Sequence, residues 1–151
     1  MTLENNKINL ILDLDQTLIS AEADEEYDFK IYKNKAKKFD FQDMDGYYIV
    51  FERPGLQEFL DFIFKNFNVS IWTAASKDYA LFIIDKIIIK DKPERKLDWI
   101  FFSYHCKISQ KIKNSSKDLT LLWDEYNIPG YNKNNTIILD DTTSSITLPV
   151  S

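Results

Sequence analysis

Cysteine is almost absent from this sequence, since Cys106 is the only one in 151 residues. One cysteine forms neither an internal disulfide nor a structural zinc cluster, a pattern typical of a reducing compartment. The amino-terminal segment lacks the basic-then-apolar pattern of a signal peptide. No apolar run reaches membrane-spanning length. We therefore expect a soluble intracellular protein, in the cytoplasm or the nucleus, with no membrane contact.

Positive charge is also scarce. The chain has 19 Lys and Arg against 24 Asp and Glu, a formal net charge of -5. This is the wrong sign for holding nucleic-acid phosphates, so we expect no direct contact with nucleic acid. The sequence has neither internal repeats nor low-complexity tracts. Its 151 residues and 44% hydrophobic content predict one compact domain over residues 1–151.

Short apolar runs alternate with amphipathic segments along the chain. The runs predict strands over residues 7–12, 69–72, 99–102 and 136–139. Helical spacing predicts helices over residues 56–67, 78–89 and 119–123. Strands that alternate with helices predict an α/β fold, a Rossmann-like parallel sheet flanked by helices.

Three further segments depart from this alternation. Asp45-Gly46, between aromatic and polar residues, predicts a small β-hairpin insert over residues 39–51. The composition of residues 20–26 predicts an acidic turn, and that of residues 107–117 predicts a polar, basic and irregular segment. Sites in open α/β sheets lie beyond the carboxyl ends of the strands, so the functional residues are expected there.

Acidic residues follow two of the predicted strands. Asp13 and Asp15 alternate beyond the first strand, so both side chains can project into one site. Asp140 and Asp141 follow the last strand. Each pair alone is at least as typical of a turn or loop as of a catalytic site. Carboxylates gathered at one sheet edge repel one another unless a cation or a proton lies between them, and two pairs together favour a Mg²⁺ site.

A threonine and a lysine complete the candidate site. Thr73 closes the strand at residues 69–72 and offers a hydroxyl and a backbone N–H beside a helix start, although such a residue is usually just a cap. Lys117 stands just before the helix predicted at residues 119–123. A positive charge there is unfavourable with respect to the helix dipole, which suggests that the lysine has a function other than stabilising the helix. Taken alone, most lysines are solvated surface residues. We expect Cys106 and His105 to be structural, because a free cysteine is usually a buried packing residue.

Five sequence blocks, in this order, resemble a known family. They are LDLDQTL from Leu12, FERPGLQEFL from Phe51, IWTAASKDYA from Ile71, KDL from Lys117 and ILDD from Ile138. The order of the motifs is similar to that of the haloacid dehalogenase superfamily. The blocks themselves resemble phosphatases of the RNA polymerase II C-terminal domain, over about residues 8–143.

The resemblance implies a role for each candidate residue. Asp13 would be the nucleophile that forms an aspartyl phosphate, and Asp15 the general acid and then the general base. Thr73 and Lys117 would hold the transferring phosphoryl group. Mg²⁺ would be bound by Asp13, Asp141 and the backbone carbonyl of Asp15, with Asp140 supporting the site from beside it.

The resemblance also implies a protein substrate. In such phosphatases the insert after the first motif helps to shape a groove for a phosphorylated, proline-containing peptide. The apolar walls of that groove would here be Phe39, Phe41, Tyr47 and Tyr48. The family continues past the acidic pair into a further strand and helix, whereas this sequence stops at Ser151, so we expect either a member shortened at its carboxyl end or a fragment.

Other functions explain less of the pattern. A bacterial receiver domain has its acidic pair early and its lysine last, whereas here Asp140 and Asp141 follow Lys117. A cysteine phosphatase needs an arginine six residues after its cysteine, where this chain has Ile112. The alternatives left open are a small-molecule or nucleotide-end phosphatase of the same superfamily and a catalytically weak phosphopeptide-binding module.

Overall fold

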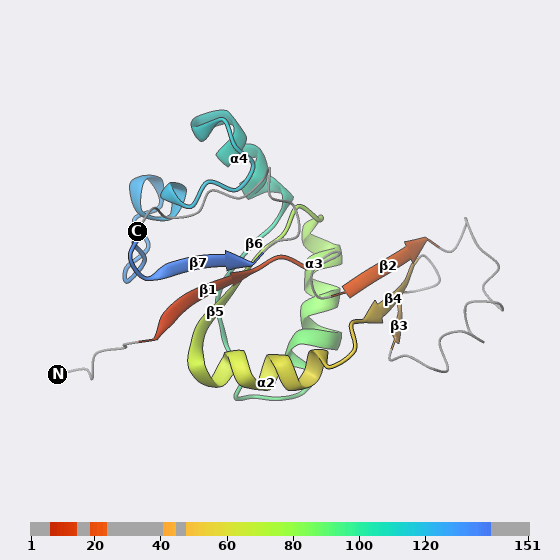
Figure 1. The fold of residues 1–151 in the computed structure, drawn as a ribbon. Coiled ribbons are helices and arrows are strands. Elements are labelled where there is room, and N and C mark those ends of the chain that lie inside the picture. Colours follow the sequence, from red (N-terminus) through yellow and green to blue (C-terminus); the bar gives the residue numbers. More distant parts are fainter. Residues whose placement is uncertain (1–6, 15–18, 24–40, 45–47, 140–151) are drawn as a thin grey trace.

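A four-stranded parallel sheet forms the centre of the fold (Figure 1). The structure, a computed structural model, describes residues 7–14, 19–23, 41–44 and 48–139, and it describes residues 19–23, 41–44 and 48–49 by their backbone alone. The central strands are β1 (Ile8–Leu12), β5 (Phe67–Trp72), β6 (Leu97–Phe101) and β7 (Thr136–Leu139), in the order β6-β5-β1-β7. All neighbouring pairs are parallel, which confirms the predicted α/β class.

Helical segments cover both faces of this sheet. One face packs against α2 (Leu56–Asn66), α3 (Lys77–Ile83) and the π-helical segment η2 (Ile84–Ile89), which continues α3. The other face packs against α4 (Ser103–Lys113) and the π-helical segment η3 (Leu121–Glu125). No helix in the described part of the chain is both long and apolar enough to span a membrane.

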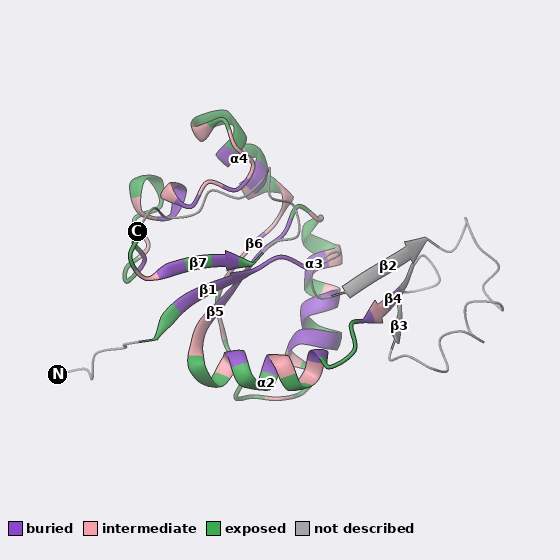
Figure 2. Cartoon of the chain, viewed as in Figure 1, coloured by how far each residue is buried: buried purple, intermediate pink, exposed green. Residues whose placement is uncertain are grey.

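Successive residues of β1 enter two separate cores, as the alternation of side chains in a strand requires. Leu10 and Leu12 pack with α2, α3 and η2, whereas Ile11 packs with α4 and η3. All three are almost completely buried (Figure 2). Burial on both faces explains why this strand has a nearly continuous apolar sequence in place of an alternating one.

A second, three-stranded sheet is drawn to the right of α3 in Figure 1. Its strands are β2 (Ile19–Ala23), β4 (Tyr48–Glu52) and β3 (Phe41–Met44), in the order β2-β4-β3. The antiparallel pairing of β3 with β4 confirms the predicted hairpin. The turn predicted over residues 20–26 is wrong at its beginning, because β2 pairs with β4 there. The acidic residues of this segment obscured a short alternation of apolar and polar residues.

The irregular segment predicted over residues 107–117 is wrong for most of its length, because α4 continues to Lys113. The buried residues of this helix are Cys106 and Ser109. These buried positions are two small residues, with Ile108 partly buried beside them, so the sequence shows only a weak apolar stripe. Asn114, with a left-handed φ of 60°, ends the helix.

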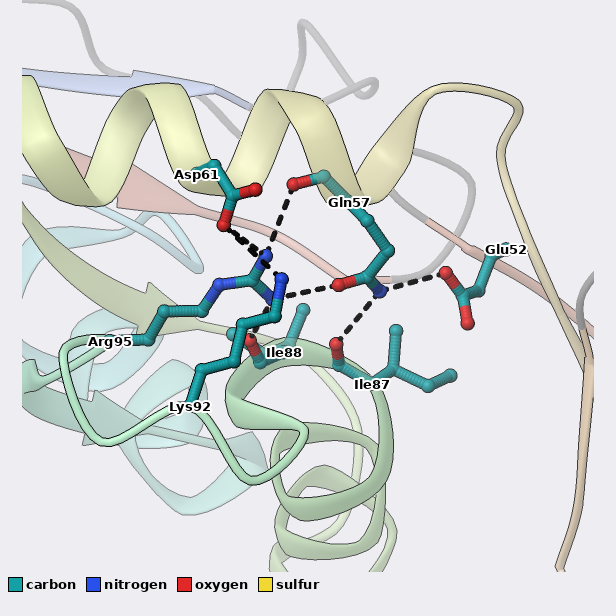
Figure 3. A network of polar contacts seen from close by, with 7 residues as sticks. All are labelled: Glu52, Gln57, Asp61, Ile87, Ile88, Lys92 and Arg95. Carbon is teal, nitrogen blue, oxygen red and sulfur yellow. Dashed lines mark hydrogen bonds and ion pairs between the residues drawn. The ribbon is translucent and has the colours of Figure 1, made fainter.

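A buried guanidinium joins α2 to the end of η2 (Figure 3). The Arg95 side chain is fully buried. Its Nη1 donates to Oε1 of Gln57 at 2.8 Å and to the carbonyl of Ile88 at 2.9 Å. Its Nη2 donates to the carbonyl of Gln57 at 3.1 Å and to Oδ1 of Asp61 at 2.7 Å. Nε2 of Gln57 then donates to Oε1 of Glu52 at 2.8 Å, which extends the network to the end of β4.

The Arg95→Met variant should lower the free energy of unfolding by about 2–3 kcal/mol, because it leaves the buried carbonyl of Ile88 without this donor and removes the bonds to Gln57 and Asp61. Urea denaturation measures this loss. Lys92→Met is the matched control, since it removes a more exposed contact to the same Asp61 at 3.4 Å and should cost less than about 0.5 kcal/mol. Equal losses in the two variants would contradict a structural role for the network.

Candidate active site

Three neighbouring strands end side by side at the carboxyl edge of the central sheet. Leu12 of β1 pairs with Ile71 of β5 and with Leu139 of β7. The backbone N–H of Asp13 donates to the carbonyl of Leu139 at 3.0 Å, so the ladder extends past the end of β1. Asp13 and Thr73 follow two of these strand ends directly. The topology therefore brings them to one edge, as the sequence predicted.

Asp13 forms a buried ion pair with Lys117. Nζ of Lys117 donates to Oδ1 of Asp13 at 3.1 Å, between residues that are 104 positions apart in the chain. Asp13 is 7% exposed and Lys117 is 3% exposed. Burying a charge is costly, and the attraction between the two groups offsets part of that cost. The carboxylate of Asp13 is a potential nucleophile, and the ammonium of Lys117 beside it is a group that can offset phosphoryl charge.

Thr73 lies in the tight connection between β5 and α3. It is 1% exposed, and its backbone N–H donates to the carbonyl of Phe101 in β6 at 3.0 Å. Its Oγ1 accepts a hydrogen bond from the N–H of Ala75 at 3.1 Å. Ser76 caps α3 by accepting from the N–H of Tyr79 at 3.3 Å. These bonds fix the path of the chain immediately after β5.

The beginning of α4 supports this edge of the sheet. Sγ of Cys106 donates to the carbonyl of Thr73 at 3.6 Å. The ring of His105 stacks on Phe101, with 4.1 Å between centroids, and its Nδ1 accepts from the N–H of Phe102 at 3.0 Å. Burial lowers the pKa of His105, which favours the neutral ring that this bond requires. Sequence reasoning missed the contact of Cys106 with Thr73, because nothing in their spacing indicates it.

The other predicted site residues are not described at the level of side chains. Five of them lie outside the described residues: Asp15, Asp140, Asp141, Phe39 and Tyr47. Phe41 and Tyr48 lie in β3 and β4, whose backbone alone is described at these positions. The roles predicted for all seven remain predictions.

Asp13 is the described member of the predicted Mg²⁺ ligand set. Within the part of the chain that the structure describes, no three His, Cys, Asp or Glu side chains gather as a metal site. The carboxylate of Asp13 is a hard oxygen donor at the end of a buried strand, the kind of ligand that Mg²⁺ prefers. The donor type therefore fits the predicted metal.

Known proteins are similar to this chain over nearly its whole length. The sequence profile of the family described as NLI interacting factor-like phosphatase matches residues 8–150. The "Putative CTD phosphatase-like protein 355R" of Invertebrate iridescent virus 6 is 47% identical over 137 residues, which cover 88% of this chain and 75% of the viral protein. The protein of the same name from Invertebrate iridescent virus 3 is 50% identical over 133 residues, 83% of this chain and 72% of that protein.

Solved structures of Fcp1, described as an essential RNA polymerase II CTD phosphatase, have a similar fold. One superposes with a TM-score of 0.60 at 21% identity and covers 90% of this chain. A fission yeast Fcp1 variant bound to beryllium fluoride gives a TM-score of 0.59, also at 21% identity and 90% coverage. This chain spans only 38% and 37% of those two chains. The profile match and the viral relatives show that the chain belongs to the NLI interacting factor-like, or CTD phosphatase-like, family of the haloacid dehalogenase superfamily.

Proposed function

We propose that this chain is a Mg²⁺-dependent protein phosphatase that hydrolyses phosphoserine or phosphothreonine through an aspartyl phosphate on Asp13. The observation that carries the proposal is the buried pair of Asp13 and Lys117, with 3.1 Å between Oδ1 and Nζ. The ammonium offsets phosphoryl charge at the position where a carboxylate nucleophile is held. Membership in a family of phosphatases supports the same reaction class.

In the first half of the reaction, a carboxylate oxygen of Asp13 attacks phosphorus, and the bond from phosphorus to the serine or threonine oxygen breaks. Asp15 donates a proton to that leaving oxygen. The Lys117 ammonium and the hydroxyl of Thr73 bind the oxygens of the phosphoryl group as it transfers. The products of this step are the free hydroxyl of the substrate and an acyl phosphate on Asp13.

In the second half, water attacks the phosphorus of the acyl phosphate and gives a proton to Asp15. The bond between phosphorus and the Asp13 oxygen breaks, inorganic phosphate leaves, and both carboxyl groups return to their starting states. Mg²⁺, held by Asp13, Asp141 and the carbonyl of Asp15 with Asp140 beside them, would supply further charge neutralisation when bound.

The proposed substrate is a phosphorylated protein of the nucleus or cytoplasm. Support comes from the CTD phosphatase-like relatives and from the small β2-β4-β3 sheet, which precedes α2 in the chain. This sheet is the element that would present a peptide groove. The aromatic residues proposed for its walls are Phe39, Phe41, Tyr47 and Tyr48.

Replacing Asp13 with Asn should lower kcat on the order of 10⁴-fold, because the amide keeps an oxygen for Lys117 but is a poor nucleophile. Phosphate release from a phosphopeptide measures the effect. The control is Asp98→Asn on β6, which alters a hydrogen bond from Tyr131 (2.6 Å) and should keep kcat near that of the unsubstituted protein. Equal activity of the two variants would rule out Asp13 as the nucleophile.

The same assay separates the two alternatives. Turnover of small phosphate esters without turnover of phosphopeptides would indicate a small-molecule phosphatase. Binding of a phosphopeptide without turnover would indicate a binding module.

Chelation should abolish phosphate release, and added Mg²⁺ should restore it. Ca²⁺ should restore it poorly, because its larger and more flexible coordination shell misplaces the nucleophile. The measurement is the initial rate after dialysis against chelator and readdition of each ion. Equal rates with the two ions would show that the metal stabilises the fold without taking part in the reaction.

A further inference from the structure

The inner face of α4 contains a serine where a helix that packs on a sheet usually has an apolar residue. Ser109 is 0% exposed. A buried hydroxyl needs hydrogen-bond partners, and a helical serine often finds one in the preceding turn of its own helix. The hydroxyl of Ser109 instead bonds to two backbone groups beyond the end of α4.

These two groups flank Lys117 in the chain. Oγ of Ser109 donates to the carbonyl of Ser115 at 2.5 Å, and it accepts from the N–H of Asp118 at 3.0 Å. One hydroxyl therefore fixes the backbone two residues before Lys117 and one residue after it. Among the hydrogen bonds described for this segment, no other side chain bonds to the backbone on both sides of the lysine.

The ends of the segment are fixed as well. Asn114 adopts a left-handed φ of 60° and turns the chain away from α4. Oδ1 of Asp118 accepts from the N–H of Thr120 at 2.9 Å and from its hydroxyl at 2.7 Å, which sets the direction in which the chain enters η3. The backbone of the segment is therefore fixed at both ends, by Asn114 and by Asp118, and the hydroxyl of Ser109 fixes it in between.

The side chain of Lys117 is long and has many rotamers, so its ammonium can be placed accurately only from a fixed backbone. The side chain is 4% exposed and its Nζ lies 3.1 Å from Oδ1 of Asp13. The hydroxyl of Ser109 is therefore connected to this ion pair by its two hydrogen bonds to the backbone and by the side chain of Lys117.

We propose that Ser109 is a positioning residue for phosphoryl transfer, which holds the segment of residues 114–118 so that Lys117 meets both Asp13 and the transferred phosphoryl group. This inference rests on the proposed function. Loss of the hydroxyl leaves the carbonyl of Ser115 and the N–H of Asp118 without this partner, and the segment moves. A displacement of about 1 Å in a group that orients substrate lowers activity by as much as roughly 100-fold.

The central experiment compares Ser109→Ala with Ser70→Ala. Ser70 is also 0% exposed and its hydroxyl also has a hydrogen bond, to Oη of Tyr131 at 3.1 Å, but that bond does not involve the lysine segment. Ser109→Ala should lower kcat/KM on a phosphate ester by roughly 10- to 100-fold. Ser70→Ala should lower it by less than about twofold. Equal losses in the two variants would overturn the proposal.

A double-substitution cycle tests whether Ser109 acts through Lys117. If it does, Ser109→Ala should cause no further loss of kcat/KM in a Lys117→Met background. An equal loss in both backgrounds would overturn the proposal, because it would mean that the hydroxyl acts independently of the lysine. Ser109→Cys, nearly the same shape with a weaker donor, should recover part of the activity and serves if the alanine variant does not fold.

A third readout does not depend on activity. Ser109→Ala should speed hydrogen exchange of the Asp118 amide, whereas Ser70→Ala should leave it unchanged. If the unsubstituted protein hydrolyses no phosphate ester, the proposed function fails, but faster exchange would still support the positioning of the lysine segment. Unchanged exchange would overturn the positioning claim by itself.

Discussion

The ion pair between Asp13 and Lys117 is the contact on which the rest of the candidate site depends. The side chains of its two members are 10% and 4% exposed, so both have lost most of their hydration. Attraction between buried charges compensates for that loss only when their geometry is well held. Asp13 is held by the sheet, through its backbone bond to β7. Lys117 is held by a segment bonded to α4.

Two polar networks, on opposite faces of the sheet, fix the connections between elements. On the face of α4, Cys106 contacts the backbone of Thr73 and Ser109 contacts the segment of Lys117, so one short helix supports both proposed phosphate-binding residues. On the other face, Arg95 and Gln57 join α2 and η2 to the end of β4. The small sheet proposed to contact substrate is therefore joined to the core by hydrogen bonds as well as by the chain.

Much of the fold was predictable, because strands of a parallel sheet have nearly continuous apolar sequences, as in the strand after residue 7 and the strand before Asp140. The first of these, β1, is buried along most of its length, whereas alternate residues of β7 are exposed. The hairpin was predictable because Asp45-Gly46 is a strong turn sequence. The helix α4 was not, because its buried residues are the small Cys106 and Ser109, and Ile108 beside them is only partly buried. The carboxyl ends of neighbouring parallel strands lie at one edge of the sheet, and this rule correctly predicted that Asp13 and Thr73 lie at the same edge. The support from α4 depends on tertiary contacts that have no sequence pattern.

In the proposed reaction Asp13 becomes phosphorylated during turnover, and chemical trapping detects this intermediate. The protein is incubated with phosphopeptide and Mg²⁺, quenched in acid and treated with borohydride, which reduces an acyl phosphate on aspartate to homoserine. Mass spectrometry of the digested protein then locates the modified residue. We expect homoserine at position 13, and only when substrate has been present. Turnover without modification at position 13, or with modification at a different carboxylate, would contradict the proposed reaction.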